Sequence, residues 1–246
     1  AGFVSVDRDD AGALEAAVNE NTAAIFIEAI QGEAGVFVVE DRMLTLAREL
    51  CDGSGALLVL DEIQTGMGRT GSLWAYQQTP VRPDVITTAK ALGGGVAIGA
   101  CITSPDTAGV LEPGDHGSTF AAGPVAASAA MAVLGIVDTP ETLRWVREPG
   151  DRLTRLLQEL DGVAEVRGRG LMIGVGLQEG LDASAINTAL LGKGLIVNAP
   201  RPDTLRLLPP FIISDEQLES AVGKIAEALR EAGDTNLKET TAGGTK

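Results

Sequence analysis

The sequence has little histidine, little cysteine and few basic residues, and each scarcity excludes a class of protein. Its 246 residues include one histidine, His116, and two cysteines, Cys51 and Cys101, too few for a metal cluster or a disulfide framework. Both cysteines stand in apolar surroundings, so the sequence predicts buried free thiols. Lys and Arg number 19 against 34 Asp and Glu, a formal net charge of −15, which argues against nucleic acid and anionic membranes as partners.

The chain also lacks a strongly apolar span. The most membrane-like window, residues 121–137, contains Pro124 and serine and is built of small residues. It predicts a close-packed buried helix over residues 124–137 and not a membrane span. We recognise no signal peptide and expect a cytoplasmic protein.

Two apolar runs, each ending at a residue that can do chemistry, are the most informative part of the sequence. ALLVLD predicts a buried parallel strand with Asp61 at its carboxyl end, and DVITT leads to Lys90 and a triple glycine at residues 93–95. A partly shielded lysine suits Schiff-base chemistry, and a buried acid opposite it suits holding a proton on a pyridine nitrogen. The alternatives are a lysine that caps a helix end or is solvated on a loop for Lys90, and a capping residue of the following loop for Asp61.

Two other charged residues, Glu28 and Arg206, occupy positions in predicted strands that suggest a role beyond structure. Glu28 closes the apolar run TAAIFIE as Asp61 closes its own run, although it could be a helix-side charge. A glycine-containing loop follows at residues 31–35, where close approach of a ligand is possible. Arg206 lies within a predicted strand, where a charge is costly unless it is paired or faces outward.

Alternating strand and helix patterns predict right-handed βαβ units and a mostly parallel sheet, followed by a small α+β domain. The expected boundaries are 1–141 for the larger domain, 142–232 for the smaller one and 233–246 for a disordered tail. We expect strands at residues 3–6, 22–28, 57–61, 84–88, 98–103, two within 164–177, 195–198 and 205–208, and helices at 10–19, 41–52, 124–137, 143–160, 183–191 and 215–232.

Five motifs in order carry a family resemblance that extends from about Phe3 to about Leu229. They are QGEAG, DEIQ with the following TGMGRTG, the separation of Asp61 from Lys90, GSTF, and NAPRPDTLRLLPP. Together they resemble the class III pyridoxal-phosphate aminotransferases. The resemblance implies an α/β fold of fold type I, pyridoxal 5'-phosphate as cofactor, and a homodimer with the active site at its interface.

Family members are longer, and this sequence opens on AGFVSVD without an initiator methionine. The resemblance therefore implies a C-terminal portion. The missing third would hold the phosphate-binding turn, an aromatic that stacks on the cofactor ring, and an arginine for substrate carboxylate.

The resemblance also implies roles for the residues of the central motif. Lys90 would be the covalent anchor of the cofactor and a proton shuttle, and Asp61 would pair with the ring nitrogen. Gln64 would donate a hydrogen bond to the phenolic oxygen of the cofactor ring. Ile63 would press on one face of the ring or simply be a core residue. Glu62, in the same motif, is also expected to bind the cofactor.

A second set of roles concerns the substrate. Thr119 would contact the cofactor phosphate of the neighbouring subunit, with Ser118 beside the substrate, although a hydroxyl pair in a loop is ordinarily turn chemistry. Glu33 and Arg206 would form a substrate switch, with Glu28 also near the substrate. The sequence departs from the family pattern at two places. Residues 121–124, after Phe120, differ from the usual residues and affect the expected shape of the loop. Ala29 stands where the family has a proline. We expect Arg169 to be structural.

The motifs are most similar to those of enzymes that convert N2-acetyl-L-ornithine and 2-oxoglutarate into N-acetyl-L-glutamate 5-semialdehyde and L-glutamate, a step of arginine biosynthesis. Two alternatives stay open. Related enzymes use ornithine, succinylornithine or 4-aminobutyrate, and a chain without the phosphate cradle could instead be a non-catalytic fragment or partner subunit.

Overall fold

The computed structural model describes residues 2–119, 121 and 123–242, with side chains as far as Asp234. The chain forms two compact units. The first unit comprises the residues up to Ile30 together with Val38–Leu143, and the second comprises Gln31–Phe37 together with the residues from Arg144 onward. Two short strands, β2 (Ile30–Gln31) and β3 (Phe37–Val38), pair where the chain passes between the units.

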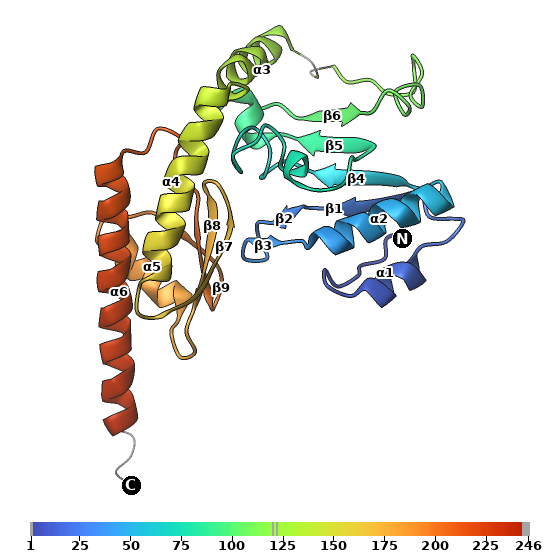
Figure 1. Ribbon diagram of the computed structural model, residues 1–246. Coiled ribbons are helices and arrows are strands. Elements are labelled where there is room, and N and C mark those ends of the chain that lie inside the picture. Colours follow the sequence, from blue (N-terminus) through green and yellow to red (C-terminus); the bar gives the residue numbers. More distant parts are fainter. Residues whose placement is uncertain (1, 120, 122, 243–246) are drawn as a thin grey trace. The chain divides into compact units, whose positions relative to one another are not determined.

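The first unit is built on a four-stranded sheet in the order β1-β4-β5-β6 (Figure 1). Strands β1 (Ala24–Ile27), β4 (Leu57–Asp61) and β5 (Val85–Thr88) are parallel, and β6 (Ala100–Thr103) runs antiparallel to β5. The predicted mostly parallel sheet is therefore confirmed. Because parallel neighbours end at the same edge of the sheet, the residues after β1, β4 and β5 lie along one edge.

Two helices cover this sheet, α1 (Ala11–Ala17) and α2 (Asp41–Ser54). Asp10 caps α1 as predicted, because its carboxylate accepts a hydrogen bond from the Ala13 N–H at 2.9 Å. Helix α2 runs past the predicted stop at Gly53 and ends at Ser54, with Gly55 as its C-cap, whose φ of 79° is the left-handed conformation that glycine adopts readily.

The core of the first unit joins α2 to the central strands. Apolar residues three or four apart on α2 face the sheet, as the helical period requires. Its main members are Leu14, Ile25, Met43, Leu44, Ala47, Cys51, Leu58, Leu60, Met67, Trp74, Val81, Ile86 and Leu92.

Several expectations for the first unit are wrong. Residues 3–6 form no strand, and Phe3 is 96% exposed. Cys51 is buried as predicted, but Cys101 is exposed. Strand β6 begins at Ala100 and not at Ile98.

Helix α3 (Pro124–Val137) forms where predicted but is not a buried helix in this chain. It packs near the short helix η2 (Lys90–Gly93), and only Ala130 and Val137 among its residues are buried. Val125, Met131 and Ile136 are exposed. The sequence could not show this, because small apolar residues all round a helix do not indicate which face is covered.

The second unit contains an antiparallel sheet in the order β7-β8-β10-β9. Its strands are β7 (Val163–Arg169), β8 (Met172–Leu177), β9 (Asn198–Arg201) and β10 (Thr204–Leu207). Its helices are α4 (Pro140–Gln158, of which the residues from Arg144 belong here), α5 (Ala183–Gly192) and α6 (Asp215–Ala242).

The largest differences from the predicted boundaries in the second unit are at β9 and α6. Strand β9 begins at Asn198, where the predicted strand ended, because a turn precedes it. Helix α6 continues to Ala242, so most of the predicted disordered tail is helical, while residues 243–246 lie outside the described part.

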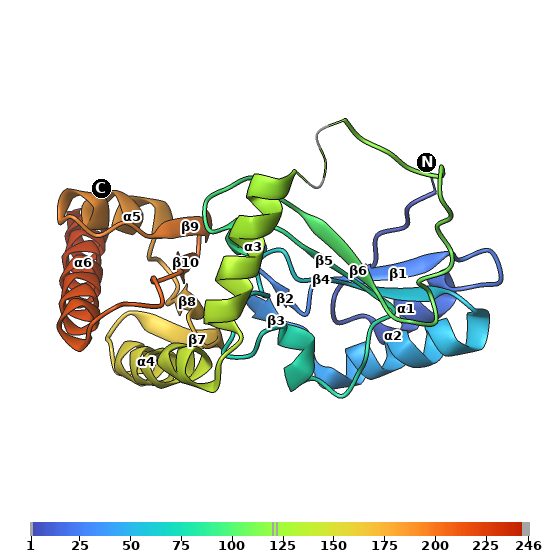
Figure 2. The same ribbon diagram turned by 90° about the horizontal axis from the view of Figure 1, so that it is seen from above.

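The two faces of this second sheet differ in character. Helices α4, α5 and α6 lie on one face (Figure 2), where they pack against Ile173, Val175, Leu177, Leu205 and Leu207. The alternate residues of β8 and β10, which include Gly174 and Arg206, face the other way. This second face carries Arg206 and its ion pair with Glu33.

Candidate active site

Strand ends bring the predicted acid and lysine to one edge of the first sheet. Asp61 is the last residue of β4 and pairs in register with Thr87 of β5, and Lys90 follows shortly after β5 ends. Glu28 comes directly after β1, the other neighbour of β4. The structure therefore places Asp61, Lys90 and Glu28 along the carboxyl edge of three adjacent parallel strands.

Asp61 presents an acceptor at this edge. Its Oδ1 accepts a hydrogen bond from the Ile63 N–H at 2.8 Å, which fixes the carboxylate against the start of the following turn. The other oxygen, Oδ2, accepts no hydrogen bond from the described residues. Ile63 and Gln64 are half-buried in that turn.

Lys90 has an unusual backbone. Its φ is 43°, a left-handed conformation that costs energy in a residue with a side chain and that clusters at functional sites. The side chain is exposed, and it forms no ion pair with any residue that the structure describes. Such an amine is open to a ligand.

Thr87 was missed by the sequence reasoning. Its hydroxyl is buried and has no hydrogen-bond partner within the described part of the chain. Residue 87 lies next to Asp61 in the sheet register. A buried hydroxyl without a partner costs free energy, so an unmatched one beside Asp61 favours a ligand here. Threonine in a strand is common, and the sequence carried no signal for it.

The Glu62 carboxylate stabilises the loop after β4 and is not available at the carboxyl edge of the sheet. Its buried carboxylate accepts hydrogen bonds from the Ala75 N–H at 3.0 Å and the Tyr76 N–H at 2.8 Å, and from the Thr65 hydroxyl. Burial raises the pKa of Glu62 above its usual range, while these three donors act in the opposite direction. Its oxygens are thus engaged by the chain itself.

The glycine loop that follows is tightly packed. A side chain at Gly66 would lie 2.7 Å from the Glu62 carbonyl oxygen and 2.7 Å from the Trp74 ring, so only glycine fits there. Burial lowers the pKa of Arg69 in this loop to about 10.

Ser118 and Thr119 lie in an exposed loop after β6. Phe120 of the same motif and Ala122 just after it lie outside the described residues.

Glu33 and Arg206 meet within the second unit. The Arg206 Nη1 donates to the Glu33 Oε1 at 2.9 Å. Arg206 is 9% exposed on β10, so the outward-facing alternative does not hold, and the charge within the strand is paired as its cost requires.

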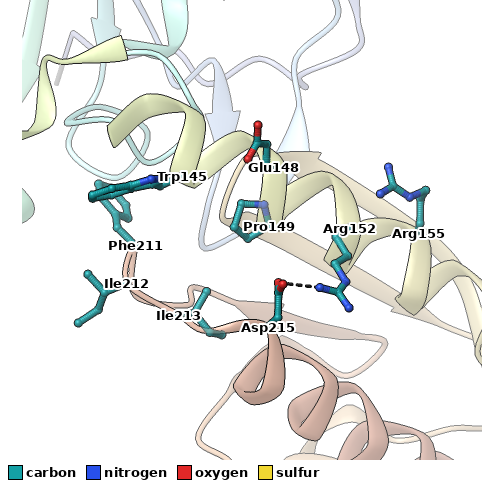
Figure 3. A pocket seen from close by; sticks show the side chains of 9 residues that line it. All are labelled: Trp145, Glu148, Pro149, Arg152, Arg155, Phe211, Ile212, Ile213 and Asp215. Carbon is teal, nitrogen blue, oxygen red and sulfur yellow. Dashed lines mark ion pairs between the residues drawn. The ribbon is translucent and has the colours of Figure 1, made fainter. Parts of the chain in front are cut away.

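A surface groove of about 550 Å³ also lies in the second unit (Figure 3). Trp145 of α4 and Phe211 lie on its walls, and Arg152 pairs with Asp215 at 2.6 Å beside it. None of the predicted site residues lines it. Among the described residues there is no group of His, Cys, Asp and Glu placed to hold a metal ion, and no helix is long and apolar enough to cross a bilayer.

Comparison with known proteins decides the family. The sequence matches the profile of the family described as Aminotransferase class-III over residues 7–229. The chain belongs to the class III aminotransferases. Members of this family adopt the fold-type I architecture, which agrees with the predicted α/β class.

Among curated relatives, the chain is 47% identical to an acetylornithine aminotransferase of Corynebacterium efficiens, over 86% of this chain and 52% of the relative. It is 42% identical to one of Neisseria meningitidis, over 96% and 61%. The chain therefore spans about half to three-fifths of the length of these family members.

Solved structures that resemble this chain are also aminotransferases. An ornithine aminotransferase of Toxoplasma gondii, described as having partial occupancy of PLP at its active site, superposes with a TM-score of 0.87 at 34% identity, covering 96% of this chain and 57% of that one. An N-acetylornithine aminotransferase of Stenotrophomonas maltophilia has a TM-score of 0.83 at 38% identity, covering 93% and 62%.

Proposed function

We propose that this protein is a pyridoxal 5'-phosphate-dependent aminotransferase that moves the terminal amino group of N2-acetyl-L-ornithine to 2-oxoglutarate. The observation that carries the proposal is the placement of Asp61 and Lys90 at the carboxyl ends of adjacent parallel strands, each with an unengaged polar group. The names of the most similar curated relatives support the choice of substrate.

The residues at the strand edge fit pyridoxal phosphate. A protonated ring nitrogen needs an acceptor, and Asp61 Oδ2 is an open one. The cofactor aldehyde needs an amine. Lys90 supplies one, and no acidic residue in the described part of the chain forms an ion pair with it. Thr87 adds a buried hydroxyl that lacks a partner within the described part. When bound, the cofactor supplies an electron sink for cleavage of a bond at the amine-bearing carbon.

The chain's own residues then have separate tasks. Asp61 keeps a proton on the ring nitrogen, Lys90 is the point of covalent attachment and carries a proton to and from the amine-bearing carbon, and Gln64 and Ile63 orient the ring. Ser118 and Thr119 serve the site of a second subunit in a homodimer. Glu62 contributes indirectly, by holding the turn that contains Ile63 and Gln64.

Glu33 and Arg206 select between the two substrates in this proposal. Glutamate presents a carboxylate close to its reacting amine, whereas acetylornithine presents none there. Glu33 neutralises Arg206 while acetylornithine is bound and swings aside when glutamate arrives, so that the planar guanidinium binds the α-carboxylate. Glu28, directly after β1 on the same strand edge, is assigned to the substrate as well.

Amine specificity is the test. The holoenzyme is offered N-acetylornithine, ornithine, succinylornithine and 4-aminobutyrate with 2-oxoglutarate, and glutamate formation is measured for each. We expect the largest kcat/KM for N-acetylornithine. A larger value for any other amine would overturn this substrate assignment while leaving the aminotransferase intact.

Ornithine is the second candidate amine, because solved structures with TM-scores up to 0.87 are named ornithine aminotransferases.

Absence of the cofactor's visible absorbance and of turnover with all four amines would favour a non-catalytic subunit. With N-acetylornithine as substrate, the protein would belong to arginine biosynthesis and act in the cytoplasm.

A further inference from the structure

A row of three residues crosses the second sheet beneath the loop that carries Glu33. Gly174 of β8 pairs with Arg167 of β7 on one side and with Arg206 of β10 on the other. Directly opposed residues in an antiparallel sheet project from the same face, so both arginines flank the glycine on the face away from the helices. The 31–37 loop lies over this row.

Arg167 makes contacts along both the loop and the sheet. Its Nε donates to the Gly35 carbonyl oxygen at 2.9 Å, and its guanidinium carbon lies 4.0 Å from the centroid of the Phe37 ring. Its Nη2 donates to the Thr204 hydroxyl at 2.9 Å, and its Nη1 pairs with Glu165. One planar side chain thus joins the loop to β10 and β7.

Gly174 allows the loop to come this close. A Cβ at residue 174 would lie 2.7 Å from the Gly35 carbonyl oxygen and 2.9 Å from the Val36 Cβ. Any side chain there would push the loop away from the sheet, and with it the carbonyl that Arg167 binds.

The loop is held in a conformation that it would not adopt freely. Gly35 has a φ of 117° and Val36 a φ of 61°, and Val36 is fully buried. A β-branched residue with positive φ persists only where its surroundings impose it. Arg167 supplies a fixed donor at the peptide between these two residues.

Resting on the function proposed above, we propose that Arg167 is a positioning residue for substrate selection. It anchors the loop backbone at Gly35 so that the Glu33 carboxylate meets Arg206. Its contacts do not involve Glu33, so the anchor stays in place when Glu33 leaves Arg206. The substrate switch is then a motion of one side chain on a fixed loop.

The charged groups around Arg167 are consistent with a fixed position of its guanidinium. Glu165 and Asp203 face it, and the guanidinium carbon of Arg201 lies 6.0 Å from the centroid of the same Phe37 ring. Burial and the nearby charge of Arg201 lower the pKa of the Arg167 guanidinium from its ordinary value, and Glu165 and Asp203 oppose that shift. A guanidinium group stays charged at neutral pH.

The first test follows the loop directly in the holoenzyme without substrate. Hydrogen exchange of a peptide covering residues 31–37 is compared for wild type, Arg167→Met, Arg167→Lys and Gly174→Ala. We expect Arg167→Met and Gly174→Ala to speed exchange about tenfold or more, the range for a lost charge-assisted hydrogen bond. Arg167→Lys should give a smaller effect, because an ammonium can reach one partner but not all of them.

A matched control removes a different arginine from the same unit. Arg152→Met breaks the ion pairs with Asp215 and Glu219 on the helix side of the sheet and should leave the loop's exchange unchanged. Loop exchange that does not change in Arg167→Met and Gly174→Ala, or that rises equally in Arg152→Met, overturns the proposal. Gly174→Ala keeps the arginine, so it tests the anchor even if Arg167→Met fails to fold.

The second test separates this inference from the proposed function. The half-reactions with acetylornithine and with glutamate are measured in each variant. We expect the rate with acetylornithine at low concentration to fall about tenfold in Arg167→Met while the glutamate reaction holds, with partial rescue in Arg167→Lys. Equal losses in both half-reactions overturn the positioning role. A faster-exchanging loop in a protein that transaminates none of the amines would instead contradict the proposed function alone.

Discussion

Glu33 and Arg206 form an ion pair of unequal partners. The Arg206 side chain is 10% exposed and the Glu33 side chain 74% exposed, with 2.9 Å between Nη1 and Oε1. The arginine is held on a strand in the sheet, whereas the acid projects from a loop into solvent. If the pair opens, the glutamate is therefore the partner that moves, because a buried charge cannot leave its site as cheaply as an exposed one.

Exchanging either partner should affect the two half-reactions in opposite ways. Glu33→Gln should leave the glutamate reaction intact or faster and weaken the acetylornithine reaction by about 1 to 3 kcal/mol, toward the lower end because Glu33 is exposed. Arg206→Lys should cost glutamate most, since an ammonium cannot bind a carboxylate with two parallel hydrogen bonds. Stopped-flow measurement of each half-reaction gives the answer. Equal losses for both variants would make the pair structural.

Asp61→Asn should retain the cofactor and lose most of its turnover. The amide keeps the shape of the carboxylate but cannot hold a proton on the ring nitrogen, and coupling of one to three pKa units corresponds to a loss of roughly tenfold to a thousandfold. Visible absorbance reports bound cofactor, and single-turnover kinetics report the loss.

Asp84→Asn is the matched control for this variant. Asp84 stands at the opposite end of β5, where its Oδ2 accepts hydrogen bonds from the Leu58 N–H and from Arg48, each at 2.7 Å. Its replacement should lower stability without changing the cofactor's spectrum. A similar loss of turnover per bound cofactor in both variants would contradict the role assigned to Asp61.

Borohydride reduction of the holoenzyme should attach the cofactor to Lys90. Lys193 is the natural comparison, because it donates to Glu231 at 3.0 Å and pairs with Glu227 at 3.1 Å, and these acids raise the pKa of its amine. A lysine held in its charged form is a poor nucleophile. Peptide mapping identifies the labelled residue, and label on Lys193 would refute the assignment of Lys90.

The strand ends could be predicted because they depend on local pattern. An apolar run that closes on an acid needs no distant information, and Asp61 and Glu28 were found in this way. The cost of a charge inside a strand predicted that Arg206 is either paired or faces outward, and the family resemblance implied Glu33 as its partner.

Contacts between distant residues could not be predicted. Arg167 reaches Gly35 across 132 residues of sequence, and nothing in RGRG distinguishes it from Arg169, the arginine that the sequence reasoning considered. The exposed face of α3 was missed for a related reason, since burial depends on what packs against a helix and not on its composition alone.

The stability of the turn after Asp61 should depend on the ionisation of Glu62. Burial raises the pKa of this carboxyl, so its contribution to stability is greatest below the ordinary pKa of glutamate and is lost as pH rises through the raised value. Glu62→Gln removes the titration and places an amide N–H₂ against the backbone donors of Ala75 and Tyr76. We expect it to destabilise the first unit by about 1 to 3 kcal/mol.

The pH dependence distinguishes this effect from simple loss of packing. The unfolding free energy of wild type minus that of Glu62→Gln should shrink as pH rises above the ordinary pKa of glutamate. Trp74, which is buried beside the Glu62 turn, reports this unit in urea titrations once Trp145 is replaced by phenylalanine. A difference that grows with pH would mean that the three donors outweigh burial and that Glu62 titrates below its ordinary range.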